Sequence, residues 1–311
     1  MKYLKIAIVL SVIAAISFFY LYIPSTIKVS SFKLSASHEL SVLRLINDQE
    51  NLAKSMHAYY DSNTHKIKVN EIQFTISAAL SNLVQIDVVS KNINTKSFIS
   101  VNSINKDSSA INWFFDIATS LNPIKRFNDF QEAIAIKKAT EQLLVSINNY
   151  VEHPVNIYGF DIKEVTLSDT VLVTTKFISK QLPTNKQIYT AMEGLNKYLA
   201  GFKRKALNNP MVTVLENPTK DYTVMVGISI DGEVAQTDSY RIKRMPVNGK
   251  MFVADVKGGF SSIQNGYGAL KTFLLDSKRP SPAVPFELLV TDRRQAADSS
   301  QWLTRIYYPV M

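Results

Sequence analysis

The sequence predicts an α+β protein with an N-terminal transmembrane helix, an antiparallel sheet closed by a long helix, and a tandem repeat of strand-helix-strand-strand units. Three observations lead to this prediction. An uncharged apolar run extends over residues 6–23, strand-like stretches lead into an amphipathic stretch at 127–150, and a helical pattern near residue 188 recurs 75 residues later. All ten glycines lie within residues 159–268, so the two halves of the chain are built differently.

The composition is that of a folded protein without cysteine chemistry. The 311 residues are 46% hydrophobic and 20% charged, which argues against intrinsic disorder and favours two domains over one. The net charge of +9 is spread over both halves rather than gathered in one basic face, so no nucleic-acid partner is expected. The absence of cysteine excludes disulfides, cysteine nucleophiles and thiolate metal sites, and it leaves the compartment open.

Residues 1–24 are predicted to form a transmembrane anchor, with the lipid bilayer as partner through residues 6–23. This run carries no charge, would span roughly 27 Å as a helix, and ends at Pro24. A cleaved signal peptide is the alternative, but the run is long for one and ends in bulky aromatic residues. A buried core helix is disfavoured because no polar face appears at a helical period. Lys2 and Lys5 favour a cytoplasmic N-terminus, and hence a single-pass membrane protein with a periplasmic or other extracytoplasmic body.

Residues 25–150 predict a sheet followed by a long helix. Strand-like alternation begins at 26–35, and one or two short helices are expected around Asn47-Asp48. The later strands are expected at 66–80, 82–90, 95–104 and 111–120, and the closing helix at 127–150. Because strands follow one another before the helix, we expect an antiparallel sheet that the last helix covers.

This layout resembles the START-like (SRPBCC, polyketide cyclase-like) helix-grip family. The resemblance rests on the proline-marked entry at Pro24, the first strand, the helical break around Asn47-Asp48 and the long closing helix. Family members usually have a Trp-rich stretch soon after the Asn-Asp pair, where this chain has residues 51–57 instead. The resemblance therefore implies a degenerate START-like domain over 25–150, whose pocket is altered or filled.

The first half offers no catalytic chemistry. Four histidines are present in the chain, at His38, His57, His65 and His153. No acidic pair lies at metal-ligand spacing from them, so surface or capping roles are expected. Glu39, Asp48 and Glu50 are expected to be charges of a helical first turn rather than catalytic carboxylates.

The second half is predicted to be an internal duplication. The helical pattern at Ile188, Leu195, Tyr198 and Leu199 recurs at Ile263, Leu270, Phe273 and Leu274. At the same offset, the strand that opens at Pro210 matches one that opens at Pro285. Several features aligned at one offset indicate two copies of one unit.

Each copy predicts strand, helix, strand, strand. The elements of the first are expected at 177–180, 184–202, 211–215 and 222–230; those of the second are expected at 250–257, 261–276, 286–291 and 302–310. Thr184 is suited to cap the first helix. Two such units related by a pseudo-twofold axis leave a groove along their seam, which is a usual place for a ligand pocket.

These segments resemble the GyrI-like domain, also called the AraC-type effector-binding domain. The resemblance is carried by residues 210–234, 241–259, the helix that ends at Phe273, the stretch 285–294 and the terminal 302–310. It implies a domain over 151–311, with repeats at about 171–232 and 247–311, around a cleft for small molecules. An anchor, a START-like half and a GyrI-like half also resemble a known bacterial domain combination.

Arg305 stands where the resemblance implies an acid. Many family members have Thr-Glu-Ile-Tyr-x-Pro-Val in the last strand, whereas this chain begins that stretch Thr-Arg-Ile-Tyr. A guanidinium donates hydrogen bonds without accepting them and repels cations, so both cation binding and acid-base catalysis are weakened. If Arg305 and Tyr307 face the cleft, an anionic or carbonyl-bearing ligand is favoured. The alternative is that Arg305 points to solvent or pairs with an acid such as Glu287.

The leading hypothesis is a membrane-anchored, non-catalytic protein that binds or senses a small hydrophobic or anionic ligand in the seam. The expected ligand-binding residues are Arg305, Tyr307, Trp302, Glu287, Phe286, Tyr267, Met225 and Tyr222. No catalytic residue, metal or cofactor is expected, because the second half lacks histidine, cysteine, a nucleophile elbow and a phosphate-binding loop.

Two alternatives stay open. One is a small-molecule hydrolase that uses Glu287 and Tyr307, and the other is an interaction module whose seam is filled by its own side chains. A DNA-binding regulator is excluded as a single chain, because no helix-turn-helix unit precedes the second half. The sequence leaves the ligand and the oligomeric state unknown.

Overall fold

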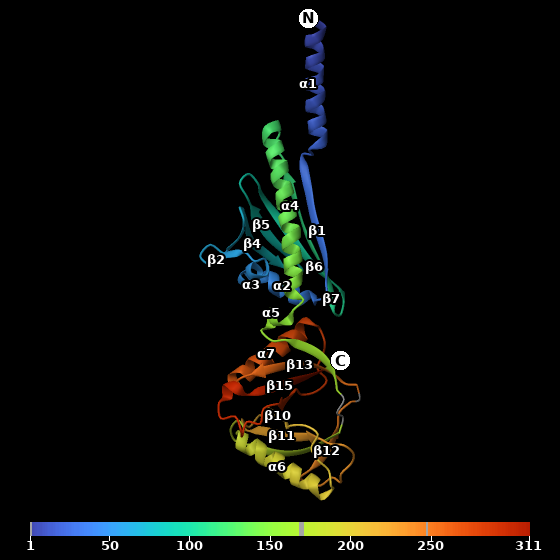
Figure 1. Cartoon of the computed structure of the whole chain (residues 1–311), viewed down its shortest axis with the longest axis vertical. Coiled ribbons are helices and arrows are strands. Elements are labelled where there is room, and N and C mark those ends of the chain that lie inside the picture. The colour runs from blue at the N-terminus through green and yellow to red at the C-terminus, as the bar shows by residue number, and fades with distance from the viewer. Residues whose placement is uncertain (1, 168–170, 247) are drawn as a thin grey trace. The chain divides into compact units, whose positions relative to one another are not determined.

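The computed structural model describes residues 2–167, 171–246 and 248–311, and it divides the chain into two compact units. One unit ends at His153 and the other begins at Pro154 (Figure 1). Each contains an antiparallel sheet with helices, which confirms the α+β class. Residues 1 and 247, where the anchor and the second repeat are predicted to begin, lie outside the described residues.

The prediction of a transmembrane anchor is wrong. Residues Lys2–Tyr22 do form helix α1, but no helix in the described ranges is long and apolar enough to cross a membrane. The end of the apolar run belongs to the folded unit instead: Ile23 is buried, the Tyr20 hydroxyl donates to the Leu121 carbonyl, and the Arg126 guanidinium lies 4.7 Å from the Tyr20 ring. The predicted single-pass location with a periplasmic body is overturned with the anchor, and the bilayer has no support as a partner.

The N-terminal unit is a seven-stranded antiparallel sheet in the order β1-β7-β6-β5-β4-β3-β2. Its strands are β1 (Thr26–Ser35), β2 (Tyr59–Asp61), β3 (Lys66–Val69), β4 (Ile72–Leu80), β5 (Leu83–Val89), β6 (Asn94–Asn105) and β7 (Ser108–Ala118). Its helices after α1 are α2 (Glu39–Asn47), α3 (Gln49–Ser55) and α4 (Pro123–Val151). The strand expected at 66–80 is divided because Asn70 takes a positive φ of 54°, which turns the chain between β3 and β4.

Helix α4 begins four residues before the sequence prediction. Asn122 caps it by accepting from the backbone N–H groups of Ile124 and Lys125, and Pro123 takes a first-turn position where no backbone donor is needed. The interior of this unit is filled by large side chains: Trp113 is fully buried, meets Phe74 edge to face, and donates from Nε1 to Ser97 Oγ.

The C-terminal unit is an eight-stranded antiparallel sheet in the order β12-β9-β11-β10-β14-β15-β13-β8. Its strands are β8 (Ile162–Thr166), β9 (Val171–Ser179), β10 (Met211–Glu216), β11 (Tyr222–Ser229), β12 (Arg241–Arg244), β13 (Lys250–Lys257), β14 (Phe286–Leu289) and β15 (Leu303–Val310). Its helices are α5 (Pro154–Tyr158), α6 (Asn185–Gly201), α7 (Phe260–Asp276) and the short 3₁₀ helix η1 (Ser299–Gln301).

Two modules of strand, helix, strand, strand make up most of this unit. The first runs β9, α6, β10, β11, and the second runs β13, α7, β14, β15. They meet where β10 pairs with β14, with Met211 opposite Leu288 and Val212 opposite Glu287. The seam of the predicted duplication therefore lies in the middle of one continuous sheet. The edge strands β8 and β12 are additions that the sequence analysis did not predict.

The two faces of this sheet bury different side chains. Val173, Val212, Val224 and Val226 pack with α6, and Ala254, Val256 and Ile306 pack with α7. The opposite face buries a separate cluster of Leu172, Met211, Met251, Val253 and Phe286. Because strand side chains alternate between faces, neighbours in sequence such as Phe286 and Glu287 belong to different environments. We call the side of the sheet that packs with α6 and α7 the helix face, and the other side the opposite face.

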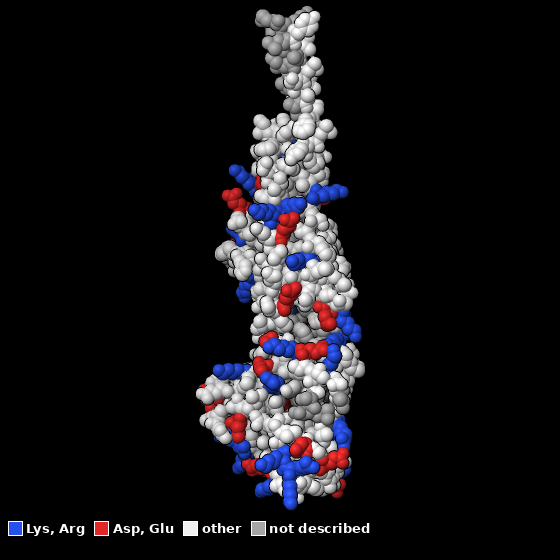
Figure 2. Space-filling view, turned by 45° about the vertical axis from the view of Figure 1, so that its right-hand side comes forward, with Lys and Arg blue, Asp and Glu red and all other residues white. Residues whose placement is uncertain are grey.

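Figure 2 shows basic and acidic side chains interspersed over both units on the displayed side. That side shows no concentrated basic face, in keeping with the even distribution of charge along the sequence.

Candidate functional site

A cleft of about 700 Å³ lies on the helix face at the seam, and we call it the helix-side cleft. Its walls come from the start of α6, from α7, and from β10 with the loops around β14. Most of its lining is apolar and includes Ile188, Val212, Val214, Phe260, Ile263 and Pro285. This volume lies within the range of small-molecule pockets, which is about 300–1,000 Å³.

Three polar side chains form the floor of the cleft: Glu287 from β14, Tyr267 from α7, and Arg293 from the segment after β14. The Glu287 side chain is only 17% exposed and that of Arg293 only 7%. The Tyr267 hydroxyl lies 3.4 Å from Glu287 Oε1, and Arg293 Nη2 lies 3.8 Å from Glu287 Oε2. Both distances exceed that of a normal hydrogen bond, so the Glu287 carboxyl has no short hydrogen bond to either Tyr267 or Arg293.

Burial governs the protonation of this floor. Removal from water raises the pKa of the Glu287 carboxyl, and the nearby Arg293 charge only partly opposes this effect. The pKa of the Tyr267 hydroxyl is raised by burial and by the neighbouring Glu287 carboxyl. Glu287 therefore holds a proton more readily than an exposed carboxyl, and Tyr267 stays a hydrogen-bond donor.

The Arg293 guanidinium is only partly satisfied. Its Nη2 donates to Thr304 Oγ1 at 2.8 Å and its Nη1 to Asn185 Oδ1 at 3.4 Å, both of them neutral acceptors. Its carbon Cζ lies 4.8 Å from the centre of the Trp302 ring. Its Nε is buried and makes no hydrogen bond to any part of the chain that the structure describes. A buried charge with so few partners costs free energy.

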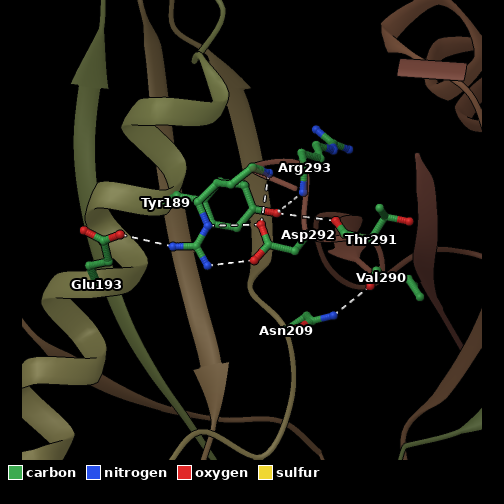
Figure 3. Close-up of polar contacts among 8 residues, drawn as sticks. Tyr189, Glu193, Asn209, Val290, Thr291, Asp292 and Arg293 are labelled. Atoms are coloured by element: carbon green, nitrogen blue, oxygen red, sulfur yellow. Dashed lines mark hydrogen bonds and ion pairs between the residues drawn. The ribbon is translucent and has the colours of Figure 1, made fainter. Parts of the chain in front are cut away.

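The segment that carries Arg293 is held against α6 by Tyr189 (Figure 3). The Tyr189 hydroxyl accepts from the backbone N–H of Arg293 at 2.9 Å and donates to the carbonyl of Thr291 at 3.4 Å. Figure 3 shows the Arg293 side chain leaving this segment on the side away from Glu193. The backbone of Arg293 is thus fixed while its side chain turns into the cleft.

A second group of contacts holds the same segment. Arg294 pairs with Asp292 at 2.7 Å and with Glu193 of α6 at 3.1 Å. Asn209 donates to the carbonyl of Val290 at 2.8 Å (Figure 3). Two consecutive arginines therefore have different roles: Arg294 anchors the segment and Arg293 lines the cleft.

Four of the eight predicted ligand-binding residues line the helix-side cleft: Glu287, Tyr267, Tyr222 and Trp302. The other four, Arg305, Tyr307, Phe286 and Met225, do not. Met225 is half-buried in β11 and alternates with the helix-face residues Val224 and Val226. The sequence analysis placed residues of both faces in one pocket, because it could not tell which parity of each strand faces the helices.

Arg305 and Tyr307 lie on the opposite face, at a second cavity of about 440 Å³. Arg305 is paired there with Asp255, at 2.6 Å from Nε and 2.9 Å from Nη2, so its partner is an acid other than Glu287. Tyr307 stacks on Phe286 with ring centres 4.9 Å apart. Glu287 and Tyr307 are therefore not brought together as the hydrolase alternative requires.

Arg293 is a charged cleft residue that the sequence analysis missed. It belongs to the stretch Thr291-Asp-Arg-Arg294, which carries part of the resemblance but was not predicted to bind a ligand. The signal in the sequence was the pair of arginines at 293–294, in the segment that follows β14, of which one could face inward.

No protein-family model matches the chain, and no curated protein matches it. Some solved structures are similar in fold. The cryo-EM structure of the EcmrR–DNA complex is 16% identical, covers 61% of this chain and 72% of that chain, and gives a TM-score of 0.44. SAV2435 bound to tetraphenylphosphonium is 15% identical, covers 48% of this chain and 93% of that chain, and gives a TM-score of 0.34.

A START superfamily protein from Mycobacterium smegmatis is 12% identical, covers 37% of this chain and 94% of that chain, and gives a TM-score of 0.27. Because every TM-score is below 0.5, neither the ligand nor the activity of this chain follows from these structures. The expected absence of a nucleic-acid partner stays a prediction.

Proposed function

We propose that the C-terminal unit binds a small molecule in the helix-side cleft and does so without catalysing a reaction. The observation that carries this proposal is the floor of Glu287, Tyr267 and Arg293, which is buried, poorly satisfied and open to the cleft. A protein that kept such groups only for stability would gain from pairing them better. These three side chains are therefore better explained as partners for the hydrogen-bonding groups of a ligand.

The walls support the same proposal. Apolar side chains such as Ile188, Val212 and Ile263 surround the floor, so a ligand can bury an apolar body while one polar group meets the floor. The volume of about 700 Å³ argues against a seam filled by its own side chains, as the interaction-module alternative requires. The non-catalytic part of the proposal rests on the separation of Glu287 from Tyr307 and on the absence of histidine and cysteine after residue 153.

A bulky substitution on β10 tests this proposal. In Val214→Trp the new ring projects into the cleft, because Val214 lines it. We expect the full chain to show upward shifts of its melting temperature with some members of a library of apolar and amphiphilic compounds, and Val214→Trp to lose those shifts.

Thr213→Trp is the matched control, since it introduces the same ring on the same strand but on the opposite face. It should keep the ligand-induced shifts. A library that gives no shift with the unmodified chain, or shifts that Val214→Trp retains in full, would contradict binding in this cleft.

A further inference from the structure

We infer that the helix-side cleft selects ligands with a carboxylate head group on an apolar body, the carboxylate binding Arg293 with Tyr267 and Glu287 as its other hydrogen-bonding partners. This inference rests on the proposed function and names its ligand class. Its first support is the charge of Arg293, which is 93% buried while its nearest carboxylate stays 3.8 Å away. The planar fork of a guanidinium matches a carboxylate in two parallel hydrogen bonds, so this ligand group satisfies it better than a neutral one.

The neighbours of Arg293 favour an anion over a cation. Since burial raises the pKa of Glu287, its carboxyl binds a proton readily and can then donate a hydrogen bond to a ligand oxygen. Tyr267 keeps its hydroxyl hydrogen because its own pKa is raised, and it can exchange its long hydrogen bond to Glu287 Oε1, at 3.4 Å, for one to the ligand. With Glu287 protonated, the floor presents three sets of hydrogens and one net positive charge. A cation placed there would meet the guanidinium at short range.

The first turn of α6 also favours an anion, because it adds to the positive electrostatic potential around Arg293. The helix begins at Asn185, which lines the cleft, and Thr184 caps it in a capping box with Gln187. Its first turn contains no acidic residue, so no side-chain charge there offsets the positive end of the helix dipole. This end of α6 therefore favours an anion on the floor beneath it.

The selection should depend on pH. Binding of a carboxylate beside Glu287 favours the protonated Glu287 carboxyl, so each bound ligand should take up part of a proton from solution. The groups that face Glu287 are Arg293 and Tyr267, and the other ionisable groups that line the cleft are Glu216 of β10 and Tyr222 of β11. Arg293 stays charged, burial keeps Tyr267 neutral by raising its pKa, and Glu216 is exposed at the rim. We therefore expect Glu287, which is buried beside Arg293 and Tyr267, to be the group that responds.

Three ligands with one body test the inference on the full chain by titration calorimetry: octanoate, 1-octanol and octylamine. We expect octanoate to bind at least about 10-fold more tightly than the other two, a difference of about 1.4 kcal/mol. Arg293→Met should remove this preference. Arg305→Met, which removes an arginine from the opposite face, should keep it.

Proton uptake on binding is a second readout, and it does not require a variant in which Arg293 is replaced. Octanoate titrations in buffers of different ionisation enthalpy should show net proton uptake, and Glu287→Gln should abolish that uptake. Equal or tighter binding of octanol or octylamine would overturn the carboxylate selection and leave the proposed function standing. A preference for octanoate that Arg293→Met keeps, or that Arg305→Met loses, would overturn the assigned site. Failure of all three ligands, together with a silent compound library, would overturn both proposals.

Discussion

At the residue scale, two arginines of the C-terminal unit meet different environments: Arg293 lines the helix-side cleft, and Arg305 lies on the opposite face of the sheet. Arg305 departs from the family pattern, and that pattern does not indicate which face of β15 the residue occupies. The neighbours settle the face: Ile306 is buried beneath α7, so Arg305 points the other way and pairs with Asp255. Arg293 lies in a connecting segment without alternation, and its direction depends on the anchoring of Arg294 and Tyr189. Such tertiary contacts have no signature in local sequence.

Glu287 gives a prediction about stability and pH. Its pKa in the folded protein is raised by burial, so its contribution to stability is fully present below the pKa of an exposed carboxyl and is lost as the pH rises through the raised value. Glu287→Gln removes the ionisable group and keeps its shape. We expect this variant to exceed the unmodified chain in unfolding free energy near neutral pH by on the order of 1 kcal/mol, and the advantage to shrink toward about pH 4.

The measurement is thermal or urea unfolding of the full chain between about pH 4 and about pH 8. Glu216→Gln is the matched control, because Glu216 is an exposed carboxyl at the rim of the same cleft. A Glu287→Gln variant that is less stable than the unmodified chain at every pH would show that the carboxylate form is the one the fold stabilises.

At the element scale, the sequence located helices with local capping chemistry well. The expected helix at 184–202 is α6 (Asn185–Gly201), because Thr184 and Gln187 form a capping box at its start. The expected helix at 261–276 is α7 (Phe260–Asp276). The strands β8 and β12 were missed because they are short and rich in charge, and their pairing with β13 and β9 decides their conformation. The helices were predicted because their signals are local, and the two edge strands were missed because they depend on partners distant in sequence.

Helix α7 lies close to the sheet at Gly266, and this contact is testable. A Cβ at Gly266 would come within 2.5 Å of Val256 Cγ2 and 2.9 Å of Ile306 Cδ1, so α7 or these two buried side chains would have to shift. We expect Gly266→Ala to destabilise the chain by about 1–3 kcal/mol in urea unfolding.

Gly268→Ala on the same helix is the matched control. Nothing lies within 4 Å of its added Cβ, so the higher helix propensity of alanine should leave stability unchanged or raise it by up to about 1 kcal/mol. Equal effects of the two substitutions would show that helix propensity, rather than the close approach of α7 to the sheet, decides the outcome.

At the scale of the whole molecule, periodicity predicted the α+β class and the two modules of the C-terminal sheet, but apolarity alone misled at the N-terminus. The run that suggested a membrane anchor ends in the folded unit, where Ile23 is buried and Tyr20 contacts Leu121 and Arg126. Hydropathy along the chain does not distinguish an apolar side chain that packs within the protein from one that would contact lipid. The position of the seam followed from the repeat, whereas the face of the sheet that carries the cleft required the structure.

The two tryptophans of the chain report on separate units. Trp113 is fully buried in the N-terminal unit, and Trp302 lines the helix-side cleft beside Arg293. A fluorescence titration with a compound that raises the melting temperature therefore tests most directly whether a ligand occupies this cleft. We expect a saturable change in emission from the unmodified chain that Trp302→Phe removes. Saturable binding by calorimetry with no change in Trp302 emission would contradict the proposed site.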